Sequence, residues 1–329
     1  MSGLGSRQEE ASAKSNMKDC VARLKELPKK HDCFIGIDSD GCVFDSMEIK
    51  HKECFCPAFI KHFGLQSASK YAREAWDFVN LYSVHRGCNR FVAIRIVHKL
   101  MSEWDVFAAR GLKIRSLPSL DAWLKEETRL ANPALEAKVK ATNDPALAKV
   151  LAWSKEVNAR VGDMVHGVPP FPRVRESLEK IHARADVIVV SQTPVEALGR
   201  EWREHEIDRW VGFIAGQEAG TKTEHIRFAT RGRYAPEKIL MIGDAPGDLQ
   251  AARENRALFF PIVPGKEEQS WEQFDKEGAD RFFKGTFAEP IRRKRSENST
   301  PHCRRKPLGK NDRGSEWPSI KTLANISKQ

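Results

Sequence analysis

An uninterrupted apolar run that stops on two acids is the feature that most constrains the fold of this chain. Residues 33–37 read Cys-Phe-Ile-Gly-Ile, and Asp38, Ser39 and Asp40 follow at once. Five residues without polar alternation are typical of a strand buried on both faces, as in a parallel sheet covered by helices. Such sheets bind ligands at the carboxyl ends of their strands. We therefore expect Asp38 and Asp40 to face a ligand-binding cleft.

Two other interpretations of this motif compete with a catalytic one. An Asp after a strand often only forms a turn or caps a helix, and this interpretation stays open for the motif taken alone. A calcium-binding loop that began at Asp38 would need Gly at its sixth position and Glu at its twelfth. The chain has Val43 and Ile49 there, so the calcium loop is excluded.

The pattern after residue 171 alternates between helix and strand. Further apolar runs are found at 187–190, 211–215, 239–242 and 258–263. Helical periodicity precedes them at 173–183, 194–204, 224–230 and 247–254. This regular alternation predicts an α/β fold with a doubly wound, Rossmann-like parallel sheet.

Residues 47–167 show only helical periodicity, as at 48–63, 70–81, 89–101 and 146–161, so an all-α domain is predicted to be inserted after the first strand. The predicted division of the chain is an N-terminal extension, 1–30; a Rossmann-like core, 31–46 and 168–288; the helical insertion, 47–167; and a basic flexible tail, 289–329.

Composition points to a soluble, cytoplasmic protein. Residues 1–15 lack the apolar segment of a secretory signal, and no apolar run is long enough to span a membrane. Seven cysteines lie without the spacing of a disulfide framework, which suits a reducing compartment. Residues 286–329 hold eleven Lys and Arg against four Asp and Glu, so +7 of the net charge of +10 falls there. We expect contact with nucleic acid or another polyanion only through this tail, no membrane partner, and leave the oligomeric state open.

The later strands also end in reactive residues. Ser191 and Gln192 follow the second strand, at the start of a helix that suits an anion. The pair Thr193 and Glu196 has capping-box spacing for that helix.

The third strand is followed by Thr221 and Glu224, which also have capping-box spacing, with Lys222 in the first helical turn. A cation is disfavoured there by the helix dipole, so its presence invites a functional explanation, although a solvated surface Lys is the more common interpretation of this residue taken alone. Asp244 and Asp248 follow the fourth strand and add a second acidic cluster at a strand end. Carboxylates from neighbouring strand ends are ligands that suit Mg²⁺.

Taken in order, Asp38-x-Asp40, Ser191, Lys222 and Asp244-x₃-Asp248 resemble the four motifs of the haloacid dehalogenase superfamily. The insertion point is similar to that of phosphoglycolate-phosphatase-like members with an all-helical cap of the C1 type. Two features depart from the family pattern: Cys42 stands where Thr or Ser is common, and the insertion is longer than the usual cap. The resemblance therefore implies a fold and a chemistry, and no particular substrate.

The resemblance implies a role for each motif residue. Asp38 would be the nucleophile that forms an aspartyl-phosphate, and Asp40 the general acid and base. Because this second acid is present, the motif resembles the phosphatases rather than the dehalogenase branch. Ser191, with Gln192, and Lys222 would bind the phosphoryl group.

Metal ligation is implied in the same way. Mg²⁺ would be held by the Asp38 carboxylate, the Asp40 carbonyl and Asp244, with Asp248 supporting them.

Two weaker signals lie in the insertion. The basic segment around Arg86 and Arg90 is a candidate for binding the leaving group of the substrate. The ordinary alternative is that these side chains are only part of the solvated surface. Cys54, Cys56 and His51 suggest a zinc site, but positions two apart on a helix do not face each other. Buried cysteines are the better expectation.

The sequence thus predicts a Mg²⁺-dependent phosphatase acting on a small phosphorylated metabolite. Two alternatives stay open: a phosphomutase on the same scaffold, and a non-catalytic protein that binds phosphate or a polyanion.

The tail gives a first testable prediction. Residues 291–329 follow the last predicted strand and have too few large apolar residues to join the core. We expect truncation after Pro290 to leave the turnover of a small substrate unchanged. A truncated protein that folds, as judged by circular dichroism, but has lost turnover would contradict this.

Overall fold

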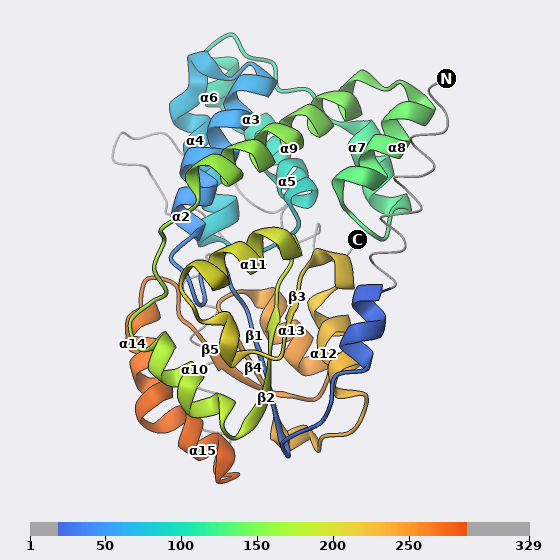
Figure 1. The fold of residues 1–329 in the computed structure, drawn as a ribbon. Coiled ribbons are helices and arrows are strands. Elements are labelled where there is room, and N and C mark those ends of the chain that lie inside the picture. Colours follow the sequence, from blue (N-terminus) through green and yellow to red (C-terminus); the bar gives the residue numbers. More distant parts are fainter. Residues whose placement is uncertain (1–18, 288–329) are drawn as a thin grey trace. The chain divides into compact units, whose positions relative to one another are not determined.

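The computed structural model describes residues 19–287 (Figure 1). The predicted tail, 289–329, and most of the predicted N-terminal extension lie outside the described residues. Within the described range the chain divides into two compact units. The core unit joins residues 19–47 to residues 165–287, and the helical unit is formed by residues 48–164.

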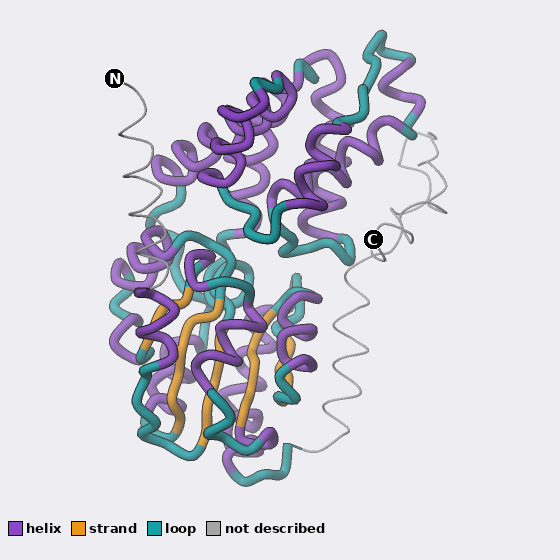
Figure 2. Tube along the Cα trace, turned by 90° about the vertical axis from the view of Figure 1, so that its right-hand side faces the viewer, coloured by secondary structure: helices purple, strands orange, loops and turns teal. Residues whose placement is uncertain are grey.

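The core unit is built on one sheet (Figure 2). Its five strands pair in parallel with each neighbour. Its strands are β1 Cys33–Ile37, β2 Ala185–Val190, β3 Phe213–Ala215, β4 Ile239–Gly243 and β5 Leu258–Pro261. Their spatial order is β3-β2-β1-β4-β5, so β1 lies at the centre. The predicted α/β fold with a doubly wound parallel sheet is confirmed, and each strand overlaps a predicted apolar run.

Both faces of the sheet are covered, which is why its strands carry no polar alternation. Ile35 and Ile37 of β1 pack on one face with α10 Val174–His182, α11 Val195–Glu204, α14 Glu267–Gln273 and α15 Ala279–Phe283. Phe34 lies on the opposite face with the helical turn at 19–25, α12 Lys222–Thr230 and α13 Pro246–Glu254. Two apolar clusters therefore hold β1 and its carboxyl end in place.

The helical unit contains the segments that the 3.6-residue periodicity predicts. Its helices are α2 Met47–Ile49, α3 Cys56–Phe63, α4 Ser69–Asp77, α5 Arg90–Ser102, α6 Asp105–Ala108, α7 Pro118–Glu126, α8 Asn132–Thr142 and α9 Pro145–Met164. Two predicted helices contain π-helical segments, Lys50–Phe55 and Phe78–Tyr82, which the periodicity does not reveal. Among the residues described, no helix combines the length and apolar character that crossing a membrane requires.

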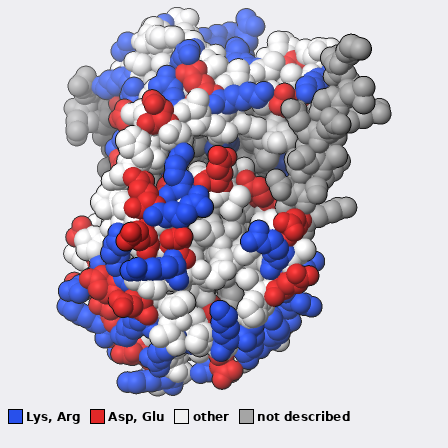
Figure 3. All heavy atoms as spheres, in the orientation of Figure 1, with Lys and Arg blue, Asp and Glu red and all other residues white. Residues whose placement is uncertain are grey.

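Charged side chains of both signs are interspersed on the face shown in Figure 3. No single-sign field covers it. This agrees with a charge that is nearly balanced outside the tail.

The close approach of β4 to α13 yields a prediction. A methyl group added to Gly243, the last residue of β4, would overlap the side chain of Asp248 in α13. We expect Gly243→Ala to lower the free energy of unfolding by about 1–3 kcal/mol, because one of the two elements must move. Gly247→Ala is the matched control, since nothing lies within 4 Å of a methyl group there. Equal denaturant midpoints for the two variants would refute the argument.

Candidate active site

The loop that follows β1 carries the first two acids, and backbone and ring contacts fix its shape. The carbonyl of Ser39 accepts from the amides of Val43 (2.8 Å) and Phe44 (3.1 Å), which turns the chain back at once. Gly41 permits this turn with a φ of 73°. The Trp202 indole donates to Ser39 Oγ at 3.0 Å, so α11 anchors the loop from the side.

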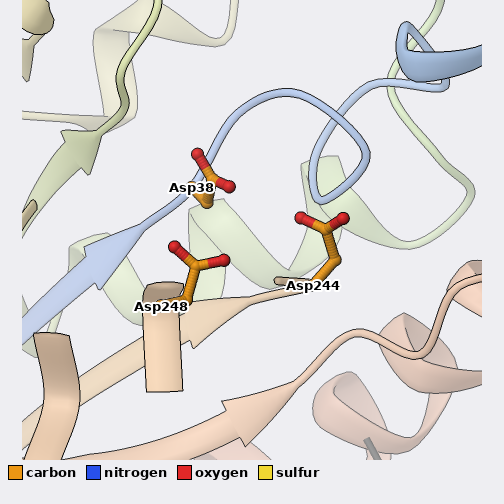
Figure 4. A group of neighbouring side chains, drawn as sticks. All are labelled: Asp38, Asp244 and Asp248. Carbon is orange, nitrogen blue, oxygen red and sulfur yellow. The ribbon is translucent and has the colours of Figure 1, made fainter. Parts of the chain in front are cut away.

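Three acids meet at the carboxyl ends of β1 and β4. Oxygens of Asp38, Asp244 and Asp248 lie within 4.8 Å of one another, and all three residues are buried. Figure 4 shows the three carboxylates grouped together. The sequence placed Asp38 and Asp244 at neighbouring strand ends, and the sheet brings them together as expected.

Lys222 is the cation of this cluster. Its Nζ lies 2.7 Å from Asp38 Oδ2 and 2.6 Å from Asp248 Oδ1, and its side chain is buried. The predicted capping box of Thr221 and Glu224 is present. Thr221 is the N-cap of α12, and Lys222 is the first residue of the helix. A cation that the helix dipole disfavours is thus held by two carboxylates.

The two carboxylates that hold Lys222 also accept backbone hydrogen bonds. Asp38 Oδ1 accepts from the amide of Ser39 at 2.8 Å. Asp248 Oδ2 accepts from the amide of Ala245 at 3.0 Å, at the start of α13. Because both oxygens of Asp248 are engaged, this residue is placed to position Lys222 and the β4–α13 turn.

Burial and the neighbouring charges both shift the pKa values of Asp38 and Lys222. Burial, reinforced by Asp248 and Asp244, raises the pKa of Asp38 well above its ordinary value, although Lys222 opposes this. Burial lowers the pKa of Lys222, but Asp248 and Asp38 outweigh it, so that this pKa lies above its ordinary value. Three buried carboxylates around one ammonium leave an excess of negative charge. An all-oxygen donor set with such an excess fits a hard divalent cation.

Asp40 is held by two hydroxyls that the sequence analysis did not assign to it. Ser46 Oγ donates to Asp40 Oδ1, and Thr193 Oγ1 donates to Asp40 Oδ2 at 2.7 Å. The capping box predicted for Thr193 and Glu196 is therefore wrong: α11 begins at Val195 after Pro194, with no side-chain cap. The Thr193 hydroxyl donates to Asp40 instead. This contact depends on the tertiary structure and could not be predicted from local spacing.

Ser191 and Gln192 lie in the segment that follows β2. Ser191 is buried, and its Oγ accepts from the amide of Thr193 at 3.2 Å. Gln192 Nε2 donates to the carbonyl of Gly220 at 2.9 Å. Gln192 thus links the loops that precede α11 and α12, and phosphoryl binding by either residue stays a prediction.

The two arginines predicted to read the substrate are both engaged within the helical unit. Arg86 is buried and donates to the carbonyl of Leu81 at 3.2 Å. Arg90 Nη1 lies 2.6 Å from Asn158 Oδ1, and its guanidinium stacks 5.0 Å from the Phe55 ring centre. Burial lowers the pKa of Arg90 to about 10, so it stays charged near pH 7. A role in substrate binding stays a prediction for both.

The cysteines expected to be buried in this unit are buried. Cys54 and Cys56 are inaccessible to solvent. The His51 ring accepts a hydrogen bond from the Trp76 indole through Nδ1, at 3.2 Å.

Comparisons with known proteins find similar solved structures at low sequence identity. A protein of Bacteroides fragilis assigned by name to the haloacid dehalogenase-like hydrolases is 16% identical, with a TM-score of 0.46, over 73% of this chain and 93% of its own. A haloacid dehalogenase-like family hydrolase of Streptococcus pneumoniae is 17% identical, with a TM-score of 0.42, over 74% and 91%. A protein of Lactobacillus delbrueckii subsp. bulgaricus assigned by name as a phosphoglycolate phosphatase is 15% identical, with a TM-score of 0.46, over 79% and 100%.

No family model and no curated protein matches the chain. At this similarity, the side chains of the site are the evidence for function.

The bridging position of Lys222 gives a prediction for the metal-free protein. We expect Lys222→Gln to lower the free energy of unfolding at neutral pH by about 3–5 kcal/mol, because it leaves buried carboxylates without their cation. The matched control is Lys284→Gln, an exposed lysine of the same unit, with an expected change within about 0.5 kcal/mol. Urea unfolding measures both, and similar values for the two would contradict the assigned pairing.

Proposed function

We propose that this chain is a Mg²⁺-dependent phosphomonoesterase of the haloacid dehalogenase type, which works through an aspartyl-phosphate on Asp38. The observation that carries the proposal is the buried Asp38 carboxylate, held by Lys222 beside Asp244 at the carboxyl end of the central strand. A buried, oriented carboxylate paired with a cation is the arrangement that a nucleophile toward a phosphate dianion needs.

In the first step an oxygen of Asp38 attacks phosphorus, and the bond from phosphorus to the ester oxygen breaks. That oxygen leaves with the bonding electrons and takes a proton from Asp40. In the second step water attacks the phosphorus of the aspartyl-phosphate while Asp40 takes its proton, and the bond from phosphorus to the Asp38 oxygen breaks with its electrons returning to the Asp38 carboxylate. Inorganic phosphate leaves, and both acids return to their starting states.

Asp40 is held in position for this role by its hydrogen bonds. The hydroxyls of Ser46 and Thr193 donate to its two oxygens, one from the β1 loop and one from the segment after β2. They fix the carboxyl group two residues beyond the nucleophile. Proton transfer to the leaving oxygen requires Asp40 to be protonated at the start of the first step.

Lys222 contributes charge at the reacting centre. Its ammonium contacts Asp38 directly, so it lowers the repulsion between the nucleophile and the incoming phosphate. Ser191, buried at the end of β2, is the proposed hydroxyl donor to a phosphoryl oxygen, with Gln192 beside it.

The donor set of the cluster fits Mg²⁺, which would be held by the Asp38 and Asp244 carboxylates and the Asp40 carbonyl. Asp248, whose oxygens already bind Lys222 and the Ala245 amide, would support this shell. When bound, the ion supplies positive charge that offsets the carboxylates and the phosphoryl oxygens.

The helical insertion, residues 47–167, is proposed to act as the cap that selects a small phosphorylated substrate, because the core motifs provide only groups for phosphate and metal. Arg86 and Arg90 remain its candidate recognition residues. Phosphate release to water supports the phosphatase, and transfer between sugar hydroxyls would instead identify a phosphomutase. Salt-sensitive retention of nucleic acid without phosphate release would identify a polyanion-binding protein.

The proposed nucleophile gives the first functional prediction. Asp38→Asn should lower turnover by more than about 10⁴-fold, because a neutral amide cannot displace an alkoxide at phosphorus. Asp45→Asn, which changes an exposed acid of the same loop, is the matched control and should retain turnover. Phosphate release over a panel of phosphomonoesters with Mg²⁺ measures both, and chelation of the metal should stop the wild-type reaction. Full activity of Asp38→Asn would rule out the covalent mechanism.

The proposed general acid gives the second. Asp40→Asn should cost about 10²–10⁴-fold with alkyl phosphates, whose leaving groups need a proton, and least with an activated aryl phosphate. The ratio of kcat/KM for the two substrate types is the readout. An equal loss for both would show that Asp40 does not protonate the leaving group.

A further inference from the structure

The helical unit contains a pocket of 330 Å³ between α5 and α7. Its wall on the α5 side is formed by Arg95, His98, Lys99 and Ser102. Residues 116–117 and two residues of α7, Asp121 and Lys125, complete the lining. Every lining residue belongs to this one unit, and none belongs to the acidic site of the core unit.

The charge of this pocket is strongly positive. Arg95, Lys99 and Lys125 contribute three cations against the single carboxylate of Asp121. Among the described residues, no ion pair is formed by any of these four side chains. The positive charge is thus available to a ligand.

Two buried polar groups distinguish this pocket from a set of solvated surface lysines. Arg95 Nε is buried and finds no hydrogen-bond partner among the described residues. His98 is only 9% exposed, and neither of its ring nitrogens makes a hydrogen bond of good geometry among the described residues, although the backbone of Arg115 lies close enough to raise its pKa in part. Buried donors are normally satisfied, so an unsatisfied pair at a pocket wall indicates a group that they would bind.

His98 can donate a hydrogen bond to an oxyanion even in its neutral form. Burial lowers the pKa of His98 to about 4, so the imidazole is neutral near pH 7. A neutral imidazole still offers one N–H donor. The rings of Phe59 and Phe63 pack edge-on against His98, at 5.7 and 4.8 Å between ring centres, and hold it in place.

The amino terminus of α7 adds to the positive potential. Leu117, which lines the pocket, is the residue that directly precedes this nine-residue helix. The positive end of the helix dipole therefore lies at the pocket, where it favours an anion.

We propose that this pocket is a second anion-binding site, which takes a small molecule carrying two or more oxyanion charges, such as a pyrophosphate or bisphosphate group. Three cations against one acid suit a ligand of at least two negative charges. The volume lies at the small end of the range for ligand pockets and fits a small molecule. The site goes beyond the proposed phosphatase chemistry and does not depend on it.

The test is a titration of the full chain with inorganic pyrophosphate, in the Asp38→Asn background and without Mg²⁺, so that no turnover can occur. The readout is the ring NMR signal of His98, assigned by its loss in His98→Gln. We expect saturable shifts that weaken as the salt concentration rises.

Two variants locate the binding. Lys99→Gln combined with Lys125→Gln should raise the Kd for pyrophosphate at least tenfold, while Lys113→Gln, an exposed lysine of the same unit outside the pocket, should change it less than twofold. Each single variant replaces the double one if circular dichroism shows that the latter is not folded. His98 signals that stay unmoved at millimolar pyrophosphate, or equal Kd values for pocket and control variants, would overturn the proposal.

Discussion

The site depends on the two ion pairs that the buried ammonium group of Lys222 forms with Asp38 and Asp248. This ammonium group joins three elements that are remote in sequence: the end of β1, the first turn of α12 and the first turn of α13. Charges taken out of water need both a partner and hydrogen bonds. Lys222 is the partner, and the amides of Ser39 and Ala245 provide the hydrogen bonds.

The topology of the sheet explains why these elements meet. The chain passes from β1 outward to β2 and β3, and it then returns to the other side of β1 to form β4 and β5. The order reverses between β1 and β4, and in doubly wound sheets the crevice for ligands opens at this reversal. Asp38 and Asp244 directly follow those two strands. The acidic cluster therefore follows from the strand order, and the Lys222 bridge then holds its geometry.

Much of this was predictable from the sequence, because strands buried on both faces and amphipathic helices have distinct periodicities. The run at 33–37 became β1 with the same bounds, and the spacing of Thr221 and Glu224 correctly predicted the start of α12. Four residues named from motifs, Asp38, Lys222, Asp244 and Asp248, meet in one cluster. Their types and their strand-end positions were sufficient to predict this, because parallel strands end at one edge of a sheet.

Hydrogen-bond partners were not predictable in the same way. Thr193 had the spacing of a helix cap, yet its hydroxyl donates to Asp40, because the fold brings this remote carboxylate within hydrogen-bonding distance. The basic character of the segment around Arg90 did not reveal that Asn158 and the Phe55 ring would engage its guanidinium. Such choices depend on tertiary neighbours, which local periodicity does not encode.

The central claim is that a phosphoryl group passes through Asp38. Its most direct test is to quench the wild-type enzyme during turnover of a phosphomonoester with Mg²⁺ and to map the modified peptide by mass spectrometry. We expect one phosphoryl group on the peptide that contains Asp38, removed by hydroxylamine as an acyl phosphate is, and absent from Asp38→Asn. Rapid phosphate release with the peptide unmodified at every quench time, or with the phosphoryl group on another residue, would contradict it.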